Sequence, residues 1–499
     1  MFHLRRRFTL AGGTGTLVTG ASILGGTETD VLSFDFTDQS ILIRDTATPA
    51  NNIHSAGIVS NGSLIGPGAK LTYTAPSPKL CLQSDGNYKY QAHNLYLNSA
   101  APANQSITVV SGATYAVTIT GSVSVTASGA AVATWTAGTN TFTAATGTLT
   151  LGSTSGSGTV HIYRTPAVTD YVATAGATLY ALPYEWNTSA VCQGIRVEEA
   201  RTNVCLWSRD LTNAVWTKTN VTAAKDQTGI DGVANSASKI TATAGNGTCL
   251  QAITLASSAR YQSAFVKRIT GSGTINMTLD AGLTWTPVTV TASWTRVEIP
   301  TQTLANPTVG FQIVTSGDAI AVDVSQNENG TFATSPIETF ASTVTRAADS
   351  IYILTSLFPV SSTTQTVFRS MKHLNNIQPT STVLSDNSYT NYVELRYIQF
   401  SAGVYSSSGT AATVTGGWDS QSGLVSKAAI AYNATNKVVC FNGTVGGSPG
   451  TAPTFGSFTR LLLASTAPNE TAASNQHYIQ KVLAAPRRYL DAELATITT

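Results

Sequence analysis

Apolar and polar residues alternate with a period of two along most of the chain. After residue 30 the alternation places Leu32, Phe34 and Phe36 on one face, and near residue 260 it repeats with Tyr261 and Phe265. Successive side chains of a strand point to opposite faces of a sheet, so the pattern indicates strands that are buried on one side. Glycines interrupt the runs at short intervals, as in sandwiches. We predict an all-β fold of tandem antiparallel β-sandwiches.

The length of 499 residues suggests about three domains of about 150 residues each. Changes of pattern and composition place the boundaries. The predicted units are an N-terminal anchoring arm (1–29), a β-rich leader (30–92), a first small sandwich that ends in a seam (93–200), a second sandwich (201–349) and a third sandwich (350–499).

One short phrase occurs twice. Residues 93–99 and 202–208 both read x-N-apolar-x-L-x-S, and strand-like alternation follows each of them. We infer an internal duplication, with a compact copy near residues 93–172 and a longer copy near 203–345. The unequal lengths distinguish it from a regular repeat array.

Composition narrows the functions that fit. Hydrophobic residues make up 42% of the chain and charged residues 11%, against about 25% charged in a typical domain. Hydroxyl and amide groups must therefore cover much of the surface, which suits sandwiches better than helical proteins. The net charge is +2 and no basic stripe is present, so we expect no nucleic-acid partner. No phosphate-binding or dinucleotide motif predicts a cofactor.

The N-terminus carries a short basic segment, Arg5-Arg6-Arg7-Phe8. A basic start is typical of a secretion signal, but the Gly- and Thr-rich stretch that follows has no clear cleavage site and is too polar to span a bilayer. A signal, a disordered tail and an anchoring arm remain open. We favour an arm that docks on a partner assembly through these four residues, and expect no membrane insertion.

The cysteines and the early aspartates do not predict a metal site. Five cysteines are an odd number and show no C-x-x-C spacing, so zinc is not expected. Buried cysteines behave as small apolar residues, although Cys192 and Cys205 flank the seam and are the pair to test as a bridge. Asp35 and Asp38 lack a third ligand nearby, which favours a role in a turn.

Catalytic constellations are missing from the sequence as well. It contains no H-E-x-x-H or P-loop motif. A glycosidase needs two carboxylates that face each other across a groove, whereas the adjacent Glu198 and Glu199 point to opposite faces of a strand. Ion pairing with Arg201 suits them better. We expect no enzymatic activity.

Three phrases carry a resemblance to a known family. They are Phe34-Asp35-Phe36-Thr37, then EEARTN (198–203) continuing into LWSRDLTNAVWTK, and TRAAD (345–349). Together they resemble tailed-phage or gene-transfer-agent-like virion structural proteins of the spike and fibre type. In that family a jelly-roll module follows the EEARTN phrase, and the TRAAD phrase leads into the next domain. The resemblance implies a structural role in a virus particle.

The last 150 residues carry a second resemblance. An alternating strand near Ile430 is followed by a return strand and by Asn442-Gly443, which predicts a tight type I′ turn. A strand at 478–483 and a short helix at 490–494 end the chain, with Asp491 at the positive end of the helix dipole. This order resembles a concanavalin-like or laminin-G-like sandwich, and implies that fold for the third sandwich.

Carbohydrate is the ligand chemistry that this third sandwich suggests. Sugars present apolar C–H faces and hydroxyl rims, which aromatic rings and carboxylate oxygens bind. Trp418 and Asp419 follow two glycines, and Tyr389 and Tyr392 lie in a polar stretch. These four are the candidate ligand-binding residues. The alternative for Trp418 is packing over the edge of the sandwich.

We therefore expect an appendage of the virion: a head spike, a collar or a tail fibre in the extracellular particle. The N-terminal arm would contact capsid, collar or tail proteins, and the distal sandwich would contact host cell-surface polysaccharide. Closed symmetry is the default for such assemblies, with a homotrimer as first expectation and a pentamer as second. Two alternatives remain open: a secreted bacterial adhesin or lectin, and a polysaccharide-degrading tailspike.

Overall fold

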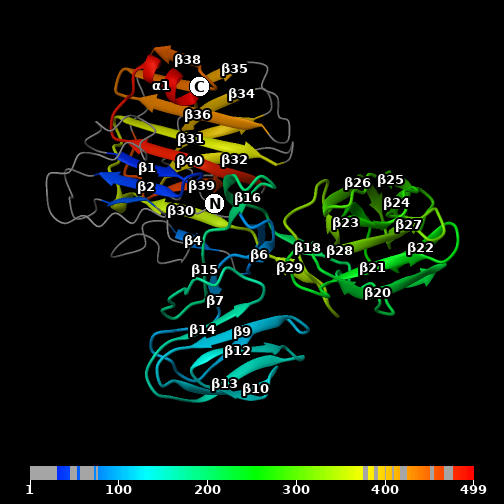
Figure 1. The fold of residues 1–499 in the computed structure, drawn as a ribbon. Coiled ribbons are helices and arrows are strands. Elements are labelled where there is room, and N and C mark those ends of the chain that lie inside the picture. Colours follow the sequence, from blue (N-terminus) through cyan, green and yellow to red (C-terminus); the bar gives the residue numbers. More distant parts are fainter. Residues whose placement is uncertain are drawn as a thin grey trace.

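The computed structural model describes residues 31–44, 53–56, 72–74, 77–374, 380–386, 392–398, 401–406, 409–415, 424–449, 455–465 and 476–499. Within these ranges nearly all regular structure is β-strand, and the named strands pair antiparallel. The predicted all-β class of antiparallel sandwiches is confirmed. Three lobes meet at a central junction (Figure 1). Among the helices described, none is long and apolar enough to cross a membrane.

The largest lobe is a two-sheet sandwich, here called the platform (Figure 1). Across its ten-stranded sheet lie β3 (Ile53–Ala56), β2 (Ser40–Arg44), β1 (Val31–Asp35), β40 (His477–Ala485), β31 (Gln365–His373), β36 (Val425–Tyr432), β37 (Asn436–Phe441) and β38 (Thr444–Pro449), with β17 (Cys192–Val197) beside β40 and β16 (Tyr184–Trp186) beside β17. Across the seven-stranded sheet lie β35 (Gly409–Thr415), β34 (Ser401–Ser406), β33 (Tyr392–Ile398), β32 (Thr380–Ser385), β39 (Arg460–Ser465), β30 (Ser350–Leu354) and β4 (Thr72–Thr74).

Segments from distant parts of the chain build this platform. β1 pairs with β40, which places Phe34 opposite Val482, and β17 pairs with the same strand further along. One apolar core contains side chains from β1, β16, β17 and the C-terminal strands. The structure thus differs from the predicted division into a leader (30–92) and a first sandwich with seam (93–200). The apolar face of β1 shares its core with strands from the other end of the chain, which local patterns do not reveal.

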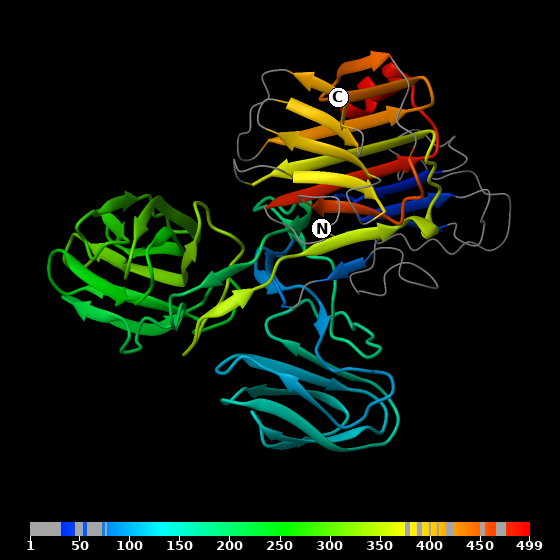
Figure 2. The same cartoon turned by 180° about the vertical axis from the view of Figure 1, so that it is seen from behind.

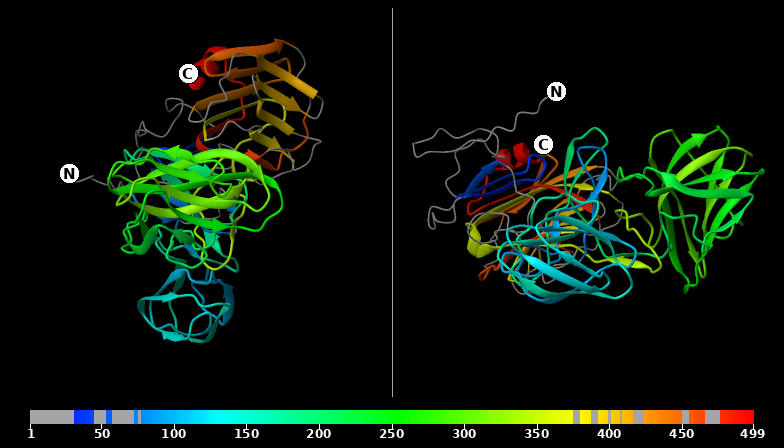
Figure 3. Two further views of the ribbon diagram at one scale, coloured as in Figure 1. Left: turned by 90° about the vertical axis from the view of Figure 1, so that its right-hand side faces the viewer. Right: turned by 60° about the horizontal axis from the view of Figure 1, so that its bottom comes forward.

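The other two lobes are smaller sandwiches inserted into the path of the platform chain. A hairpin of β5 (Leu80–Leu82) and β6 (Tyr88–Tyr90) precedes the first insert, and η2 (Thr355–Leu357) follows β30 after the second. Each insert has its own apolar core. Figures 2 and 3 show both inserts projecting from the junction as separate bodies.

The strands of the two inserts form two sheets each. In the first insert they are β11 (Ala133–Trp135), β10 (Ser124–Gly129), β13 (Thr148–Ser155) and β8 (Gln105–Thr108), packed on β12 (Gly138–Thr143), β9 (Thr114–Ile119) and β14 (Val160–Arg164). In the second they are β19 (Thr217–Thr219), β22 (Gly247–Ala252), β27 (Thr308–Ile313), β24 (Ile275–Thr278) and β25 (Thr286–Val288), packed on β20 (Val221–Gln227), β21 (Ala237–Ala242), β28 (Ala319–Asn329), β23 (Ser258–Thr270) and β26 (Thr295–Leu304).

A two-stranded stalk joins each insert to the junction. The first stalk is β7 (His93–Asn94) with β15 (Leu179–Tyr180), and the second is β18 (Arg201–Asn203) with β29 (Val344–Arg346). The asparagine of the repeated phrase lies on each stalk, opposite Leu179 in the first and opposite Val344 in the second. The two stalks therefore have the same register relative to the phrase.

The asparagine of the first copy organises the base of its insert. The buried Asn94 amide donates to the carbonyls of Val160 (3.2 Å) and Val172 (2.9 Å). Its Oδ1 accepts from the backbone N–H groups of Tyr96 and Ile162, both at 3.0 Å. One side chain thus satisfies four backbone groups from three segments, which would otherwise be left unpaired in the interior.

Asn203 makes the same four hydrogen bonds in the second copy. Its amide donates to the carbonyls of Ser325 (3.1 Å) and Ile337 (2.8 Å). Its Oδ1 accepts from the N–H groups of Cys205 (3.0 Å) and Asn327 (3.1 Å). The acceptors are 12 residues apart in both copies, as Val160 and Val172 are in the first.

The rest of the phrase repeats its contacts too. Ser99 and Thr174 exchange backbone-to-hydroxyl bonds of 3.0 and 2.9 Å, and Ser208 and Thr339 do the same at 3.2 and 2.9 Å. A buried or half-buried glutamine clamps the leucine of each phrase through both of its backbone groups. The pairs are Gln105 with Leu97 and Gln251 with Leu206. These matched bonds confirm the internal duplication.

The turn and the helix predicted near the C-terminus are also present. Asn442 and Gly443 have φ angles of 42° and 80°, so the β37–β38 hairpin closes with positive φ at both turn residues, as predicted. The single α-helix described, α1 (Asp491–Thr498), packs Leu494 and Ile497 against the outer face of the ten-stranded sheet. The predicted helix was shorter and began one residue earlier.

The duplicated framework gives a first testable prediction. We expect Asn203→Ala to lower the free energy of unfolding of the second insert by at least about 2 kcal/mol, because it leaves buried backbone groups without partners. Asn94→Ala should do the same to the first insert. Hydrogen exchange resolved by segment measures both.

Asn140→Ala is the control, because the Asn140 amide makes only one hydrogen bond of 3.4 Å at the surface. Equal protection losses for Asn140→Ala and Asn203→Ala would contradict the role given to the repeated asparagine.

Candidate functional site

Most residues predicted to bind a ligand or a partner lie outside the described residues. These are Trp418, Asp419, Tyr389 and the docking segment Arg5, Arg6, Arg7 and Phe8. Tyr392 is described: it begins β33, is half-buried and pairs with Ser385 of β32. The sugar-binding role of these four residues therefore stays a prediction.

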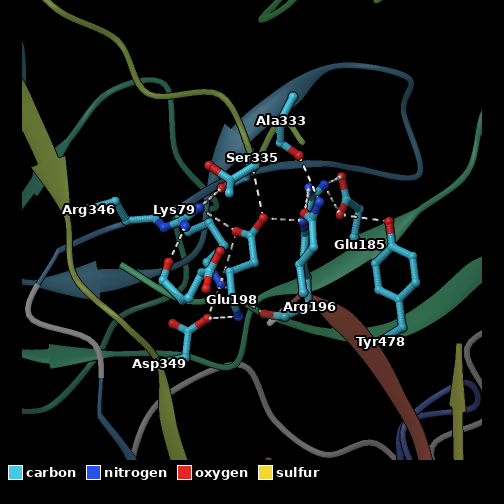
Figure 4. Close-up of polar contacts among 12 residues, drawn as sticks. Lys79, Glu185, Arg196, Glu198, Ala333, Ser335, Arg346, Asp349 and Tyr478 are labelled. Atoms are coloured by element: carbon cyan, nitrogen blue, oxygen red, sulfur yellow. Dashed lines mark hydrogen bonds and ion pairs between the residues drawn. The ribbon is translucent and has the colours of Figure 1, made fainter. Parts of the chain in front are cut away.

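The junction of the three lobes holds a network of buried charges instead, here called the junction network (Figure 4). Its three cations and three anions come from segments before, between and after the two inserts. They are Lys79, Arg196 and Arg346 with Glu185, Glu198 and Asp349. Each of the six residues is less than a tenth exposed.

Glu198 lies at the centre of the network. Its Oε1 accepts from Arg196 Nε (2.9 Å) and from the backbone N–H of Ser335 (2.8 Å). Its Oε2 pairs with Arg346 and lies 3.4 Å from Lys79 Nζ. This carboxylate thus links β17, the second stalk, the segment that closes the second insert and the segment before β5.

Two further carboxylates complete the charge balance. Asp349 pairs with Lys79 and accepts from the N–H of Glu198 at 2.7 Å. Glu185 pairs with Arg196 at 2.8 Å and accepts from the hydroxyl of Tyr478 in β40 at 2.9 Å. Every charge of the network has an opposite charge in contact, which is the condition for burying ions at a tolerable cost.

The electrostatics of Glu198 follow from these contacts. Burial alone would raise the pKa of its carboxyl, but Arg196, Arg346 and Lys79 together hold that pKa well below the usual value for glutamate. The pKa of the Arg196 guanidinium is raised well above its usual value, because Glu185 and Glu198 outweigh the opposing effect of burial. Glu198 and Arg196 are therefore both charged at neutral pH.

A second ionic cluster joins the two inserts to each other. Arg209 forms a two-pronged pair with Asp323 (2.6 and 2.9 Å) and contacts Asp231 (2.6 Å). It also lies 3.4 Å from Glu338, which pairs with Arg164 of the first insert at 2.8 Å. Glu338 therefore bridges an arginine of each insert.

These arrangements suit structural support rather than catalysis. The central carboxylates are occupied by cations and are shielded from solvent, so they are not placed to reach a substrate. Among the described residues, no group of three or more His, Cys, Asp or Glu side chains could hold a metal ion. All five cysteines are described and none is bridged: Cys192 is half-buried and the others are buried. The Cys192–Cys205 bridge is therefore not formed.

Sequence reasoning identified part of this site. Glu199 does pair with Arg201, as predicted, but Glu198 turns into the network instead. Arg346 and Asp349 belong to the TRAAD phrase, which was assigned only to a crossover between domains. Lys79 and Glu185 gave no signal, because an isolated charge in a strand-rich stretch is normally solvated.

Four tryptophans lie in apolar alternations, a pattern that indicates core positions. They are Trp207, Trp216, Trp285 and Trp294. Trp216 is buried (1% exposed), whereas the other three are half-buried. Trp294 stacks under Lys267, whose Nζ lies 4.8 Å from the ring centre. Alternation therefore identified the strands but not the depth of these rings.

Comparisons with known proteins add little to this picture. No family model matches the chain, and no curated protein matches it. Among solved structures, the chain is similar to the N-terminal CBM22-1-CBM22-2 tandem domain of Xyn10C from Paenibacillus barcinonensis, at 10% sequence identity and a TM-score of 0.21. The match covers 60% of this chain and 98% of that chain. A TM-score of this size supports no conclusion about shared architecture.

The junction network gives a second prediction. Glu198→Gln leaves three buried cations against two anions, so we expect it to lower the free energy of unfolding by about 3–5 kcal/mol. Chemical denaturation followed by tryptophan fluorescence measures the change.

Glu298→Gln is the matched control, since the Glu298 side chain is 40% exposed and lies 3.5 Å from Arg296. An exposed pair of this kind contributes less than about 1 kcal/mol. Similar losses in both variants would contradict a special role for the buried network.

A third prediction concerns pH. His93 lies on the first stalk, with Nδ1 at 2.7 Å from the carbonyl of Gln91 and Nε2 accepting from the N–H of Arg164. Burial is the main reason that the pKa of His93 falls to about 3 from its ordinary 6.5. The imidazole is thus neutral when folded, and its contribution to stability is full above pH 6.5 and is lost as the pH falls toward 3.

We expect the first insert to lose about 1.4 kcal/mol of stability per pH unit below 6.5 from this residue alone. Hydrogen exchange, corrected for the intrinsic effect of pH, measures the loss. The second insert contains no histidine and is the internal control between pH 6.5 and 5. Parallel loss of protection in both inserts would refute the assignment.

Proposed function

We propose that this chain is a non-enzymatic structural protein of a tailed-phage or gene-transfer-agent-like particle. In this proposal it forms a spike, collar or fibre that displays β-sandwich modules to a glycan-bearing surface. The platform is the body of the appendage, and the two inserts are the displayed modules.

The observation that carries the proposal is where the family-like phrases lie. Residues 198–203 run from the centre of the junction network into the second stalk, and residues 345–349 return from that stalk to Asp349 of the same network. Both phrases therefore encode the device that fixes a projecting module to a body. A protein that must present modules at a set distance and angle needs such a device.

Attachment to host glycan is the second part of the proposal. The first insert presents threonine hydroxyls on paired strands, as in the 3.0 Å contact between Thr118 and Thr139. Such surfaces offer donors and acceptors to polysaccharide hydroxyls without a charge requirement. Trp418, Asp419, Tyr389 and Tyr392 remain candidate contacts.

Assembly follows from the same role. The N-terminal segment with Arg5, Arg6, Arg7 and Phe8 would dock on capsid, collar or tail proteins. A homotrimer is the first expectation and a pentamer at a five-fold vertex the second, because closed rotational symmetry is usual for homo-oligomers. The platform is the part available for contacts between copies, since both inserts project away from it.

Particle composition tests this function. Particles from a strain that carries the gene are purified by density gradient, and their proteins are identified by mass spectrometry. We expect peptides of this chain to sediment with the capsid protein. Its absence from particles, together with a processed N-terminus in the culture fluid, would favour a secreted adhesin or lectin. Release of oligosaccharides from host polysaccharide would favour a degrading tailspike.

A further inference from the structure

A cavity of about 490 Å³ lies between the base of the first insert and the two stalks. This volume lies within the range of about 300–1,000 Å³ that is usual for small-ligand sites. Its floor is buried and mainly apolar. The floor residues are Leu95, Ile107, Val109, Tyr115, Arg164 and Tyr180.

Hydroxyl groups form the rim of this cavity. Ser106 and Thr108 come from β8, Thr178 precedes the first stalk strand β15, and Thr345 comes from the second stalk. All four residues are exposed. An aromatic and apolar floor with a rim of hydroxyls matches the two kinds of surface of a sugar ring, its C–H face and its hydroxyl edge.

The floor contains one buried cation and one tyrosine hydroxyl that can donate a proton. Arg164 is 5% exposed, stacks on the ring of Tyr90 at 4.9 Å and donates from Nη2 to Glu338. Its Nε is shielded from solvent and so does not reach into the cavity. The hydroxyl of Tyr115 accepts from the N–H of Val110, which leaves its own proton free to be donated. This hydroxyl suits a ligand rich in oxygen acceptors.

Charge around the cavity is balanced. No residue from 90 to 163 is Asp, Glu, Lys or Arg, and Glu338 neutralises Arg164 at 2.8 Å. The surface therefore offers no field that would attract a charged ligand over a distance. A neutral saccharide fits these surroundings better than an acidic one.

Comparison of the two inserts distinguishes residues that line the cavity from residues of the shared structural framework. Framework residues such as Asn94 and Ser99 recur in the second copy with the same bonds. Several cavity residues do not: by the matched registers, Tyr180 corresponds to Thr345, Arg164 to Asn329 and Ser106 to Ala252. The fold of an insert therefore does not require these side chains. Arg164 serves the contact with Glu338, whereas the rim hydroxyls point to a ligand.

We propose that this cavity is a binding site for one unit of a neutral, hexose-containing glycan. The inference rests on the proposed function, because it assigns the glycan contact to a defined site in the first insert. Tyr115 and Tyr180 would face the C–H surface of the sugar, and the rim hydroxyls would bind its oxygens.

Binding of the full-length chain to an array of neutral and acidic oligosaccharides tests the proposal, followed by titration calorimetry of the best ligand. Thr108→Trp places an indole in the mouth of the cavity. We expect it to weaken binding at least about tenfold. Thr134→Trp is the matched control, because Thr134 is an exposed residue on edge strand β11 of the same sheet and does not line the cavity. It should leave affinity unchanged.

The salt dependence of binding and a variant at a second site distinguish the possible outcomes. We expect affinity to stay constant between about 0.05 and 0.5 M salt, since exposed charges are screened over that range and none is involved. Unchanged binding by Thr108→Trp with loss in Trp418→Ala would overturn the cavity and keep the glycan function. Binding of acidic glycans only, lost in salt, would overturn the neutral ligand. No binding to any glycan or host surface would overturn the glycan part of the proposed function itself.

Discussion

Compensated charge at the junction is the constraint on which the arrangement of the three lobes depends. Three cations and three anions are withdrawn from water there, and each is acceptable only while its partners are in place. Apolar packing of the same volume could give equal stability, but it would accept many relative orientations. Paired ions with fixed hydrogen bonds accept few. The network therefore acts mainly on geometry, by specifying how stalk, platform and hairpin meet.

The duplicated inserts show a division of labour within one fold. Asn94 and Asn203 each satisfy four backbone groups, and the serine–threonine and glutamine clamps beside them are matched in both copies. Away from these clamps the copies differ in strand length, in charge and in the groups that face the stalk. A module built this way can change its surface freely, because its base is held by side chains that do not take part in any surface.

The strands, the sandwich class, the repeated phrase and the Asn442-Gly443 turn could be predicted from the sequence. All of these depend on neighbours within a few positions, where period and turn chemistry are decisive. The sequence did not predict how the platform is assembled, because the partner of Phe34 in β1 is Val482 in β40. The junction network could not be predicted either, because its six charged residues are spread along the chain from Lys79 to Asp349. Each of them, taken alone, is expected to be a solvated surface residue. The acids of the EEARTN phrase were noticed, but their partners could not be named without the fold.

The pairing of β1 with β40 bears on how the polypeptide acquires its structure during synthesis. Contacts that join residues some 450 positions apart form late, whereas each insert closes within its own contiguous segment. As the chain leaves the ribosome, the two inserts can fold in turn while the edge of β1 that pairs with β40 still lacks its partner strand. The body is completed last, around appendages that are already rigid, and only after the ribosome has released the final strand.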